Sequence, residues 1–175
     1  MTDDLNQGMS DAAAVGDANT VKTMPVMFHA QFVRDISFEN PQPATIYETK
    51  GTRPVMDVGF SIECLPVPSQ QFKSMYEVQV GVKIHARRDD SIAFVTEVLY
   101  SVLASLDGVP EEQHHPLLYI EVPRYAFPYV RQIISDLTGQ AGMLPLLLSP
   151  VDFRALYMQR FGEEIKKSRA AAGAA

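Results

Sequence analysis

The chain has 175 residues, 46% of them hydrophobic, with a formal net charge of −6 and a single cysteine, Cys64. This length predicts one domain with tails. The acidic balance excludes a duplex nucleic-acid binder, because phosphate contacts need clustered Lys and Arg. One cysteine excludes an internal disulfide and a Cys-only metal site, and it fits a reducing compartment.

Residues 1–23 are rich in Asp, Gly and small residues and hold no aromatic residue, a composition typical of a disordered tail. They lack the basic start and the sustained apolar run of a signal peptide. The sequence has no stretch of about 18 apolar residues, so we expect no transmembrane helix. We therefore expect a soluble cytoplasmic domain at residues 24–166, followed by a second disordered tail at residues 167–175.

Four segments alternate polar and apolar residues with period two, which predicts the strands of an antiparallel sheet with one wet face. The segments are residues 26–38, 55–62, 76–85 and 92–103. The first places its apolar residues on one face, interrupted only by Arg34. The turn at residues 87–90 predicts a hairpin between the third and the fourth. The fourth is apolar on both faces, and this predicts a partner surface.

A long connection, Asn40 to Ser74, holds five prolines and contains the second segment. Such a length is typical of a functional or disordered segment. After the fourth segment, Pro110 begins a helical region that extends to about Gln140. Pro128 suits the first turn of a helix. An apolar stripe follows it, formed by Tyr129, Ile133, Ile134 and Leu137.

Pro145 and Pro150 keep the next ten residues extended, as an apolar strap. Asp152 is the expected N-cap of a last helix. The residues on one side of that helix are Phe153, Leu156, Tyr157 and Phe161. The order of elements predicts an α+β fold, a four-stranded antiparallel sheet with two C-terminal helices on one face.

The sequence offers little catalytic chemistry. His114 and His115 are adjacent and would point about 100° apart on a helix, a poor pair for one metal ion, so we expect solvent-exposed or interface histidines. Cys64 has no nearby His or Lys to activate it and is expected to be a packed thiol. Asp35 and Glu39 lie about 13 Å apart on one strand, too far for a glycosidase pair.

That spacing favours a ladder of surface acids, which Glu77 and Glu97 would extend across neighbouring strands. A solvated strand face is the plainer interpretation of the same residues. We expect no enzyme, no cofactor and no metal site.

Several ordered motifs resemble the SecB family of bacterial export chaperones, over about residues 28–161. The motifs are Asp35-Ile-Ser-Phe-Glu39-Asn-Pro41, Tyr76-Glu-Val to Ala86, Ala93-Phe-Val-Thr-Glu97-Val, Phe127-Pro-Tyr-Val-Arg131, Gly142, and Pro145-Leu-Leu-Leu-Ser-Pro150-Val-Asp-Phe-Arg-Ala-Leu156. The last block is the most specific. Where better-known members carry interface cysteines, this chain has Thr96 and Leu117, and Pro116 interrupts the short helix.

The resemblance implies a homotetramer, a dimer of dimers with helices between two eight-stranded sheets. It implies an ATP-independent chaperone in the cytoplasm that binds unfolded preproteins and delivers them to the SecA motor ATPase, with no nucleic acid and no membrane insertion. One alternative is a chaperone dedicated to another client, such as an antitoxin. Another is an enzyme or small-ligand protein that uses the apolar pocket with His114 or His115.

The resemblance also implies two sets of site residues. The SecA-facing sheet surface carries Asp35, Glu39, Val95 and Glu97. The client-binding groove, between the long connection and the last helix, carries Met56, Val58, Phe60, Leu144, Leu146, Phe153 and Tyr157. Flexible and polarizable Met side chains suit a groove that accepts many client sequences.

Overall fold

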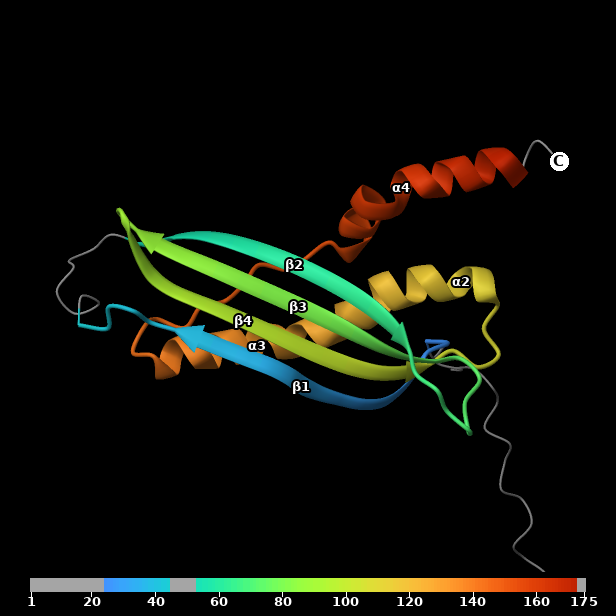
Figure 1. Ribbon diagram of the computed structural model, residues 1–175, viewed down its shortest axis with the longest axis horizontal. Helices are drawn as coiled ribbons and strands as arrows, with labels where there is room; N and C mark the ends of the chain where they lie inside the picture. The colour runs from blue at the N-terminus through green and yellow to red at the C-terminus, as the bar shows by residue number, and fades with distance from the viewer. Residues whose placement is uncertain (1–23, 45–52, 173–175) are drawn as a thin grey trace, which may run out of the picture.

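The computed structural model describes residues 24–44 and 53–172. Its strands are β1 (Met27–Glu39), β2 (Val55–Pro66), β3 (Met75–Arg88) and β4 (Ser91–Ser105). They form one four-stranded sheet in the order β1-β4-β3-β2, with every neighbouring pair antiparallel (Figure 1). The predicted α+β fold is confirmed, and β1 and β2 are the edges of the sheet.

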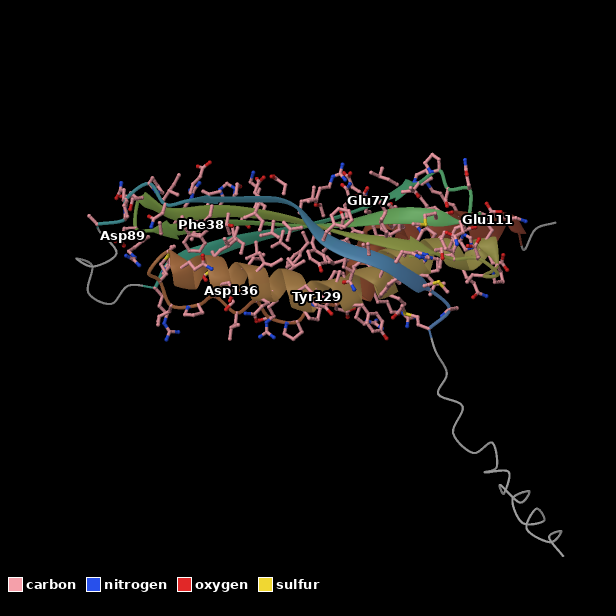
Figure 2. The ribbon with its side chains drawn as sticks, turned by 90° about the horizontal axis from the view of Figure 1, so that it is seen from below. Phe38, Glu77, Asp89, Glu111, Tyr129 and Asp136 are labelled. Atoms are coloured by element: carbon pink, nitrogen blue, oxygen red, sulfur yellow. The ribbon has the colours of Figure 1, made fainter. Side chains whose placement is uncertain are left out.

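The helices follow the sheet in sequence; the helix at Val122–Gln140 covers one face of the sheet, and the last helix lies beyond the β2 edge (Figure 1). They are α2 (Glu111–Pro116), the π-helical segment η1 (Leu117–Glu121), α3 (Val122–Gln140) and α4 (Phe153–Ala172). Figure 2 shows α3, labelled at Tyr129 and Asp136, as a layer beneath the sheet. We call the face of the sheet toward α3 the inner face and the opposite one the outer face. No helix in the described ranges is long and apolar enough to cross a membrane.

The core lies between α3 and the inner face. Alternation along β3 and β4 sends every second side chain toward the helix, and these side chains are almost completely buried. They include Val78, Val80, Val82 and Ile84 of β3, and Phe94, Val98, Tyr100 and Val102 of β4, which pack with Val130 and Ile134 of α3. The apolar residues of β4 on the outer face, Val95, Leu99 and Leu103, are half-buried, so the predicted two-sided strand is confirmed.

β1 does not keep one apolar face along its length. Its pairing with β4 shifts around His29 and again around Arg34. Directly opposite residues of a pair point to the same side, so Phe28 and Phe38 lie on the inner face and Phe32 on the outer face. The expected continuous apolar face of this segment is wrong, because each bulge adds a residue and reverses the alternation.

The helical region runs without a break from Glu111 to Gln140, close to the expected Pro110 to Gln140, but the place of Pro128 within it differs. Pro128 lies inside α3, so its expected place in the first turn is wrong, and Pro123 takes that place instead. η1 lies between Pro116 and Pro123. A proline ring clashes with the carbonyl one turn before it, and the wider π-turn gives room for such rings within one continuous helical run.

The strap between the last two helices is tied at both ends. Gly142, with a φ of 78°, ends α3 in the left-handed conformation that glycine tolerates. The Thr138 hydroxyl accepts the N–H of Leu146 at 2.9 Å. The Asp152 carboxylate accepts the N–H of Ala155 at 3.0 Å, which confirms the expected N-cap.

α4 continues to Ala172, across residue 166, where we expected the domain to end. The expected N-terminal tail, residues 1–23, lies outside the described residues. The division into one domain and two tails therefore stays a prediction.

Candidate functional site: an inner apolar groove and an outer charged face

An apolar cavity of about 340 Å³ lies where β2, η1 and α4 meet. Phe60 and Ile62 of β2 form one side of it, and Tyr119 of η1 forms another. The side chains from α4 are Leu156, Tyr157, Gln159, Arg160 and Phe161. Alternation along β2 places Phe60 and Ile62 on the inner face, opposite Val82 and Val80. The cavity is therefore on the helix side of the sheet, at its β2 edge.

Aromatic and hydrogen-bonding contacts fix α4 beside this cavity. The Tyr157 hydroxyl and His115 Nδ1 are 2.9 Å apart, and the rings of Tyr119 and Phe161 are 5.0 Å apart. Arg160 Nη1 donates to the carbonyl oxygen of Ile62 at 2.8 Å, which links α4 to β2 directly. Desolvation lowers the pKa of His115, with Arg160 acting in the same direction and Glu164 opposing it. The ring is therefore neutral near pH 7.

The structure brings together only part of the predicted client groove. Phe60 and Tyr157 line the same cavity. Phe153 is 2% exposed and lies beneath Phe127, with ring centroids 5.8 Å apart. Val58 and Leu146 are half-buried against the core.

The remaining two predicted groove residues are more accessible. Leu144, in the strap, is 91% exposed. Met56 is 39% exposed and lines a different cavity of about 830 Å³ at the far end of β2. The strap therefore offers more accessible apolar surface than the buried start of α4.

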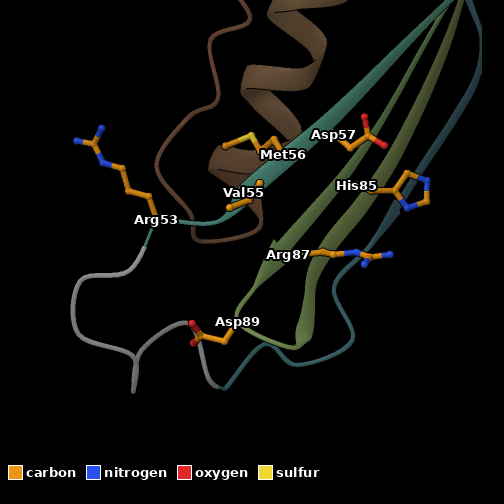
Figure 3. Close-up of a pocket in the computed structure, with 7 residues that line it drawn as sticks. All are labelled: Arg53, Val55, Met56, Asp57, His85, Arg87 and Asp89. Atoms are coloured by element: carbon orange, nitrogen blue, oxygen red, sulfur yellow. The ribbon is translucent and has the colours of Figure 1, made fainter.

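The cavity that Met56 lines carries charged residues that do not converge. Figure 3 shows Asp57, His85 and Arg87 pointing to one side of β2 and β3, while Met56 points to the other. Alternation along the strands explains this, because Asp57 pairs with His85 and Met56 pairs with Ala86. The cavity wraps around the edge strand and does not form a catalytic centre.

The four residues predicted to face SecA all lie on the outer face. Glu39 is directly opposite Val95, and Asp35 is directly opposite Leu99. Glu97, on the same side of β4, forms an ion pair with Lys83 of β3. Asp35 and Glu39 are exposed and have no ion-pair partner among the described residues. The structure therefore brings this set together, with its free negative charge concentrated on β1.

Glu77 does not belong to a ladder of free surface acids. Its carboxylate accepts hydrogen bonds from Ser101 at 2.7 Å, from Arg34 at 2.8 Å and from Gln79 at 3.0 Å. These bonds, that of Ser101 foremost, hold the pKa of Glu77 below its ordinary value against the opposing effect of burial. Glu77 thus joins β1, β3 and β4 and is not available to a partner.

Two other sequence-based expectations have different outcomes. His114 is 8% exposed, and its Nε2 lies 2.9 Å from the carbonyl oxygen of Val109. The expected exposed or interface position is therefore wrong for His114, because this histidine ties α2 to the preceding loop. The packed thiol is confirmed, since burial raises the pKa of Cys64 to about 12 and Sγ donates to the carbonyl oxygen of Leu118. The described residues hold no cluster of metal ligands.

Sequence reasoning missed Tyr119 and Arg160. Tyr119 lies in the π-helical segment, where the ordinary helical period does not give the direction of a side chain. Arg160 acts through its bond to a backbone carbonyl of a distant strand, which no local pattern indicates. The close spacing of Tyr157, Arg160 and Phe161 on one helix is the signal that was available.

The chain is similar to known proteins over most of its length. The family described as preprotein translocase subunit SecB matches residues 19–164. Protein-export protein SecB of Zymomonas mobilis is 38% identical over 144 residues, which are 82% of this chain and 85% of that protein. Protein-export protein SecB of Rhodospirillum rubrum is 35% identical over 164 residues, 94% and 96% of the two chains.

A solved structure shares the fold. It is a SecB-like chaperone of Mycobacterium tuberculosis in complex with a peptide from the HigA1 antitoxin. Its TM-score is 0.55 at 15% sequence identity, over 72% of this chain and 87% of that one.

Proposed function

The chain belongs to the SecB family, and on that premise we propose that it captures unfolded preproteins in the cytoplasm and delivers them to the SecA motor. It is a protein-export chaperone and not an enzyme. Capture works by mass action without ATP, because binding of the unfolded chain opposes its folding.

The observation that carries client binding is the accessible apolar surface of the strap and α4. Leu144 and Leu147 of the strap are 91% and 62% exposed, and Met158 of α4 is 47% exposed. Phe60 and Tyr157 line the separate cavity between β2, η1 and α4. Such surface binds extended apolar segments with little demand on their sequence, and Met adapts its shape to different partners.

The test of client binding uses an unfolded, reduced model protein and the full chain. We expect the chain to suppress aggregation of this client without ATP and to form a complex that co-elutes in size exclusion. Aggregation at the rate seen without the chaperone would contradict the proposal. A pull-down that recovers one protein alone would instead assign the chain to a dedicated client, such as an antitoxin.

The outer face is the proposed docking surface for SecA, with Asp35, Glu39, Val95 and Glu97 as contacts. Separated carboxylates can each meet a different Lys or Arg of a basic partner, and such charges act mainly on the rate of encounter. Glu97→Lys should abolish measurable binding of SecA in titration calorimetry at low salt, while client binding persists. If Glu97→Lys and Asp35→Ala both bind SecA like the parent chain, the docking face is misassigned.

A homotetramer, a dimer of dimers, is the proposed assembly. β1 is an edge strand with exposed Phe32, Val33 and Ile36, and an exposed apolar edge favours pairing with another chain. Tyr125 and Tyr129 of α3 are each 52% exposed on the helix layer and offer a second apolar contact. Light scattering after size exclusion tests the assembly, and a stable monomer at micromolar concentration would contradict it.

A further inference from the structure

Arg160 gives a charge to the cavity between β2, η1 and α4. Among the described residues that line this cavity, it is the one charged side chain, and the others are aromatic, aliphatic or amide. An arginine side chain keeps its proton at every pH that proteins meet, so the charge is permanent. The cavity of about 340 Å³ therefore combines an apolar interior with one fixed positive charge.

The guanidinium of Arg160 is held in one place. Its Nη1 donates to the carbonyl oxygen of Ile62 on β2 at 2.8 Å. Its Cζ lies 5.0 Å from the ring centre of Phe161 and 5.8 Å from that of Tyr119, distances at which a cation is attracted to an aromatic ring. One hydrogen bond and two rings thus orient this group before any client arrives.

The positive charge of Arg160 has no counter-ion in the described part of the chain. Arginine has five N–H donors, and no carboxylate of the described residues lies within ion-pair distance of this one. The charge acts on the opposite wall of the cavity. Burial raises the pKa of Tyr119, and the charge of Arg160 opposes that rise. The cavity therefore offers a positive charge and free N–H donors to whatever enters it.

We propose that Arg160 makes this cavity select client segments in which an acidic residue stands beside a large apolar or aromatic one, an inference that rests on the client binding proposed above. The apolar side chain enters the cavity between Phe60 and Tyr157, which line it from β2 and α4. The neighbouring carboxylate accepts hydrogen bonds from the free N–H groups of Arg160. Bonds between two charged groups are the strong ones.

The same charge places other segments below this one. A Lys or Arg beside the apolar side chain is repelled by Arg160. An uncharged neighbour covers the guanidinium without pairing its charge, and desolvation of an unpaired charge is costly. The chain as a whole has a formal net charge of −6 and repels acidic segments, so the preference belongs to this cavity and not to the whole surface.

Three labelled peptides with blocked ends test this preference on the full-length chain, by fluorescence anisotropy at low salt. The peptides share one sequence with a single aromatic side chain and differ only in the residue beside it, which is Glu, Gln or Lys. We expect the Glu peptide to bind about tenfold more tightly than the Lys peptide, with the Gln peptide between them. High salt should reduce this ratio, because Arg160 is exposed and its charge is screened.

Three variants separate the charge of Arg160 from its position. Arg160→Met keeps a long side chain without the charge and should bring the ratio of the Glu and Lys peptides close to one. Arg160→Lys keeps the charge and should retain most of the ratio. Arg154→Met is the matched control, because it removes the same charge from an exposed position of α4 outside the cavity. This control should keep the ratio of the parent.

The outcomes separate this inference from the function on which it rests. If the parent binds none of the peptides, client binding at this cavity fails, and this inference fails with it. If the parent binds all three equally well, the inference is wrong, while client binding stands. If Arg160→Met weakens all three by the same factor, Arg160 only holds α4 against β2. If Arg154→Met lowers the ratio as much as Arg160→Met, the general charge of α4 is responsible and not the cavity.

Discussion

On the inner face of the sheet, β3 and β4 present almost only apolar side chains to α3, whereas on the outer face charged and polar side chains stand among half-buried apolar ones such as Leu99. Two neighbouring residues of β4 illustrate the difference. Val98 is 1% exposed and belongs to the core, while the side chain of Glu97 is 42% exposed and pairs with Lys83. Successive side chains of a strand point to opposite faces, so neighbouring residues differ in their exposure and in their contacts.

This difference fits two kinds of recognition in one small domain. Apolar contact is non-directional, so the inner side suits clients that share little beyond exposed hydrophobic segments. Charges at fixed positions are directional in their effect, because a partner with the wrong charge is repelled. The outer face therefore suits a single dedicated partner. The predictions below test whether the two sides are energetically separate in this way.

The largest expected effect is on stability, from Phe153→Ala on the helix side. Phe153 is 2% exposed, and its ring contacts that of Phe127. Removal of a buried aromatic side chain costs about 3–5 kcal/mol of unfolding free energy. Urea denaturation at one fixed protein concentration measures this loss, with the 91% exposed Leu144 changed to Ala as the control. A loss under about 1 kcal/mol would show that the Phe153 ring does not contribute to the core.

The second effect is on client binding. The double change of Leu144 and Leu147 to Ser removes exposed apolar surface from the strap and should weaken binding of an unfolded client by about 1–2 kcal/mol, roughly tenfold. The unfolding free energy should hardly change, because neither side chain is buried. Fluorescence anisotropy with a labelled unfolded client measures the affinity. An unchanged affinity would move the groove away from the strap.

The elements of the fold could be predicted from the sequence because the signals for them are local. These signals are the spacing of apolar residues and the residues that begin or end a helix or strand. Alternation located the strands, the turn at residues 87–90 located the hairpin, and Asp152 located the start of α4. The bulges of β1 could not be predicted in this way. The bulges fall at His29 and Arg34, but a polar residue is also ordinary on the wet face of a strand, so only pairing with β4 reveals them.

The candidate site was predictable to a smaller extent, since it depends on register between distant segments. The resemblance placed Asp35, Glu39, Val95 and Glu97 on one face, and the register brings them together. It could not show that Lys83 neutralises Glu97 or that Ser101 engages Glu77, because those contacts cross from one strand to the next. The burial of His114 was missed for a different reason: its partner is a backbone carbonyl of the preceding loop, whose position the residue types do not indicate.

The third prediction concerns pH and the outer face. The pKa of Glu77 is lowered in the folded chain from an ordinary value of 4.5, so its ionised form stabilises the fold. That contribution is present above pH 4.5 and is lost as the pH falls through the lower, folded-state value. Glu77→Gln should therefore be less stable than the parent near pH 7, and the gap should close below pH 4.5.

Urea denaturation of the parent and of Glu77→Gln between pH 7 and pH 3.5 measures this difference in unfolding free energy. The salt concentration is chosen so that both proteins keep the same oligomeric state. The matched control is Glu63→Gln, an exposed acid on the same face of β2 for which no such network of hydrogen bonds is seen in the described residues. If the difference in unfolding free energy stays constant over this range, the negative charge of Glu77 does not contribute to stability.

The smallest expected effect comes from Lys83→Gln, which separates stability from docking on the outer face. The side chains of Lys83 and Glu97 are 54% and 42% exposed. Ion pairs with that exposure contribute roughly 0–1 kcal/mol, so the unfolding free energy should change by less than about 1 kcal/mol.

Lys83→Gln also frees the charge of Glu97 and makes the outer face one unit more negative. Binding of a basic SecA surface should then strengthen a few-fold at low salt. The gain should vanish as salt shortens the screening length toward about 8 Å. Titration calorimetry at two salt concentrations measures both, and a gain that persists at high salt would show that Lys83 obstructs the partner by its bulk rather than by its charge.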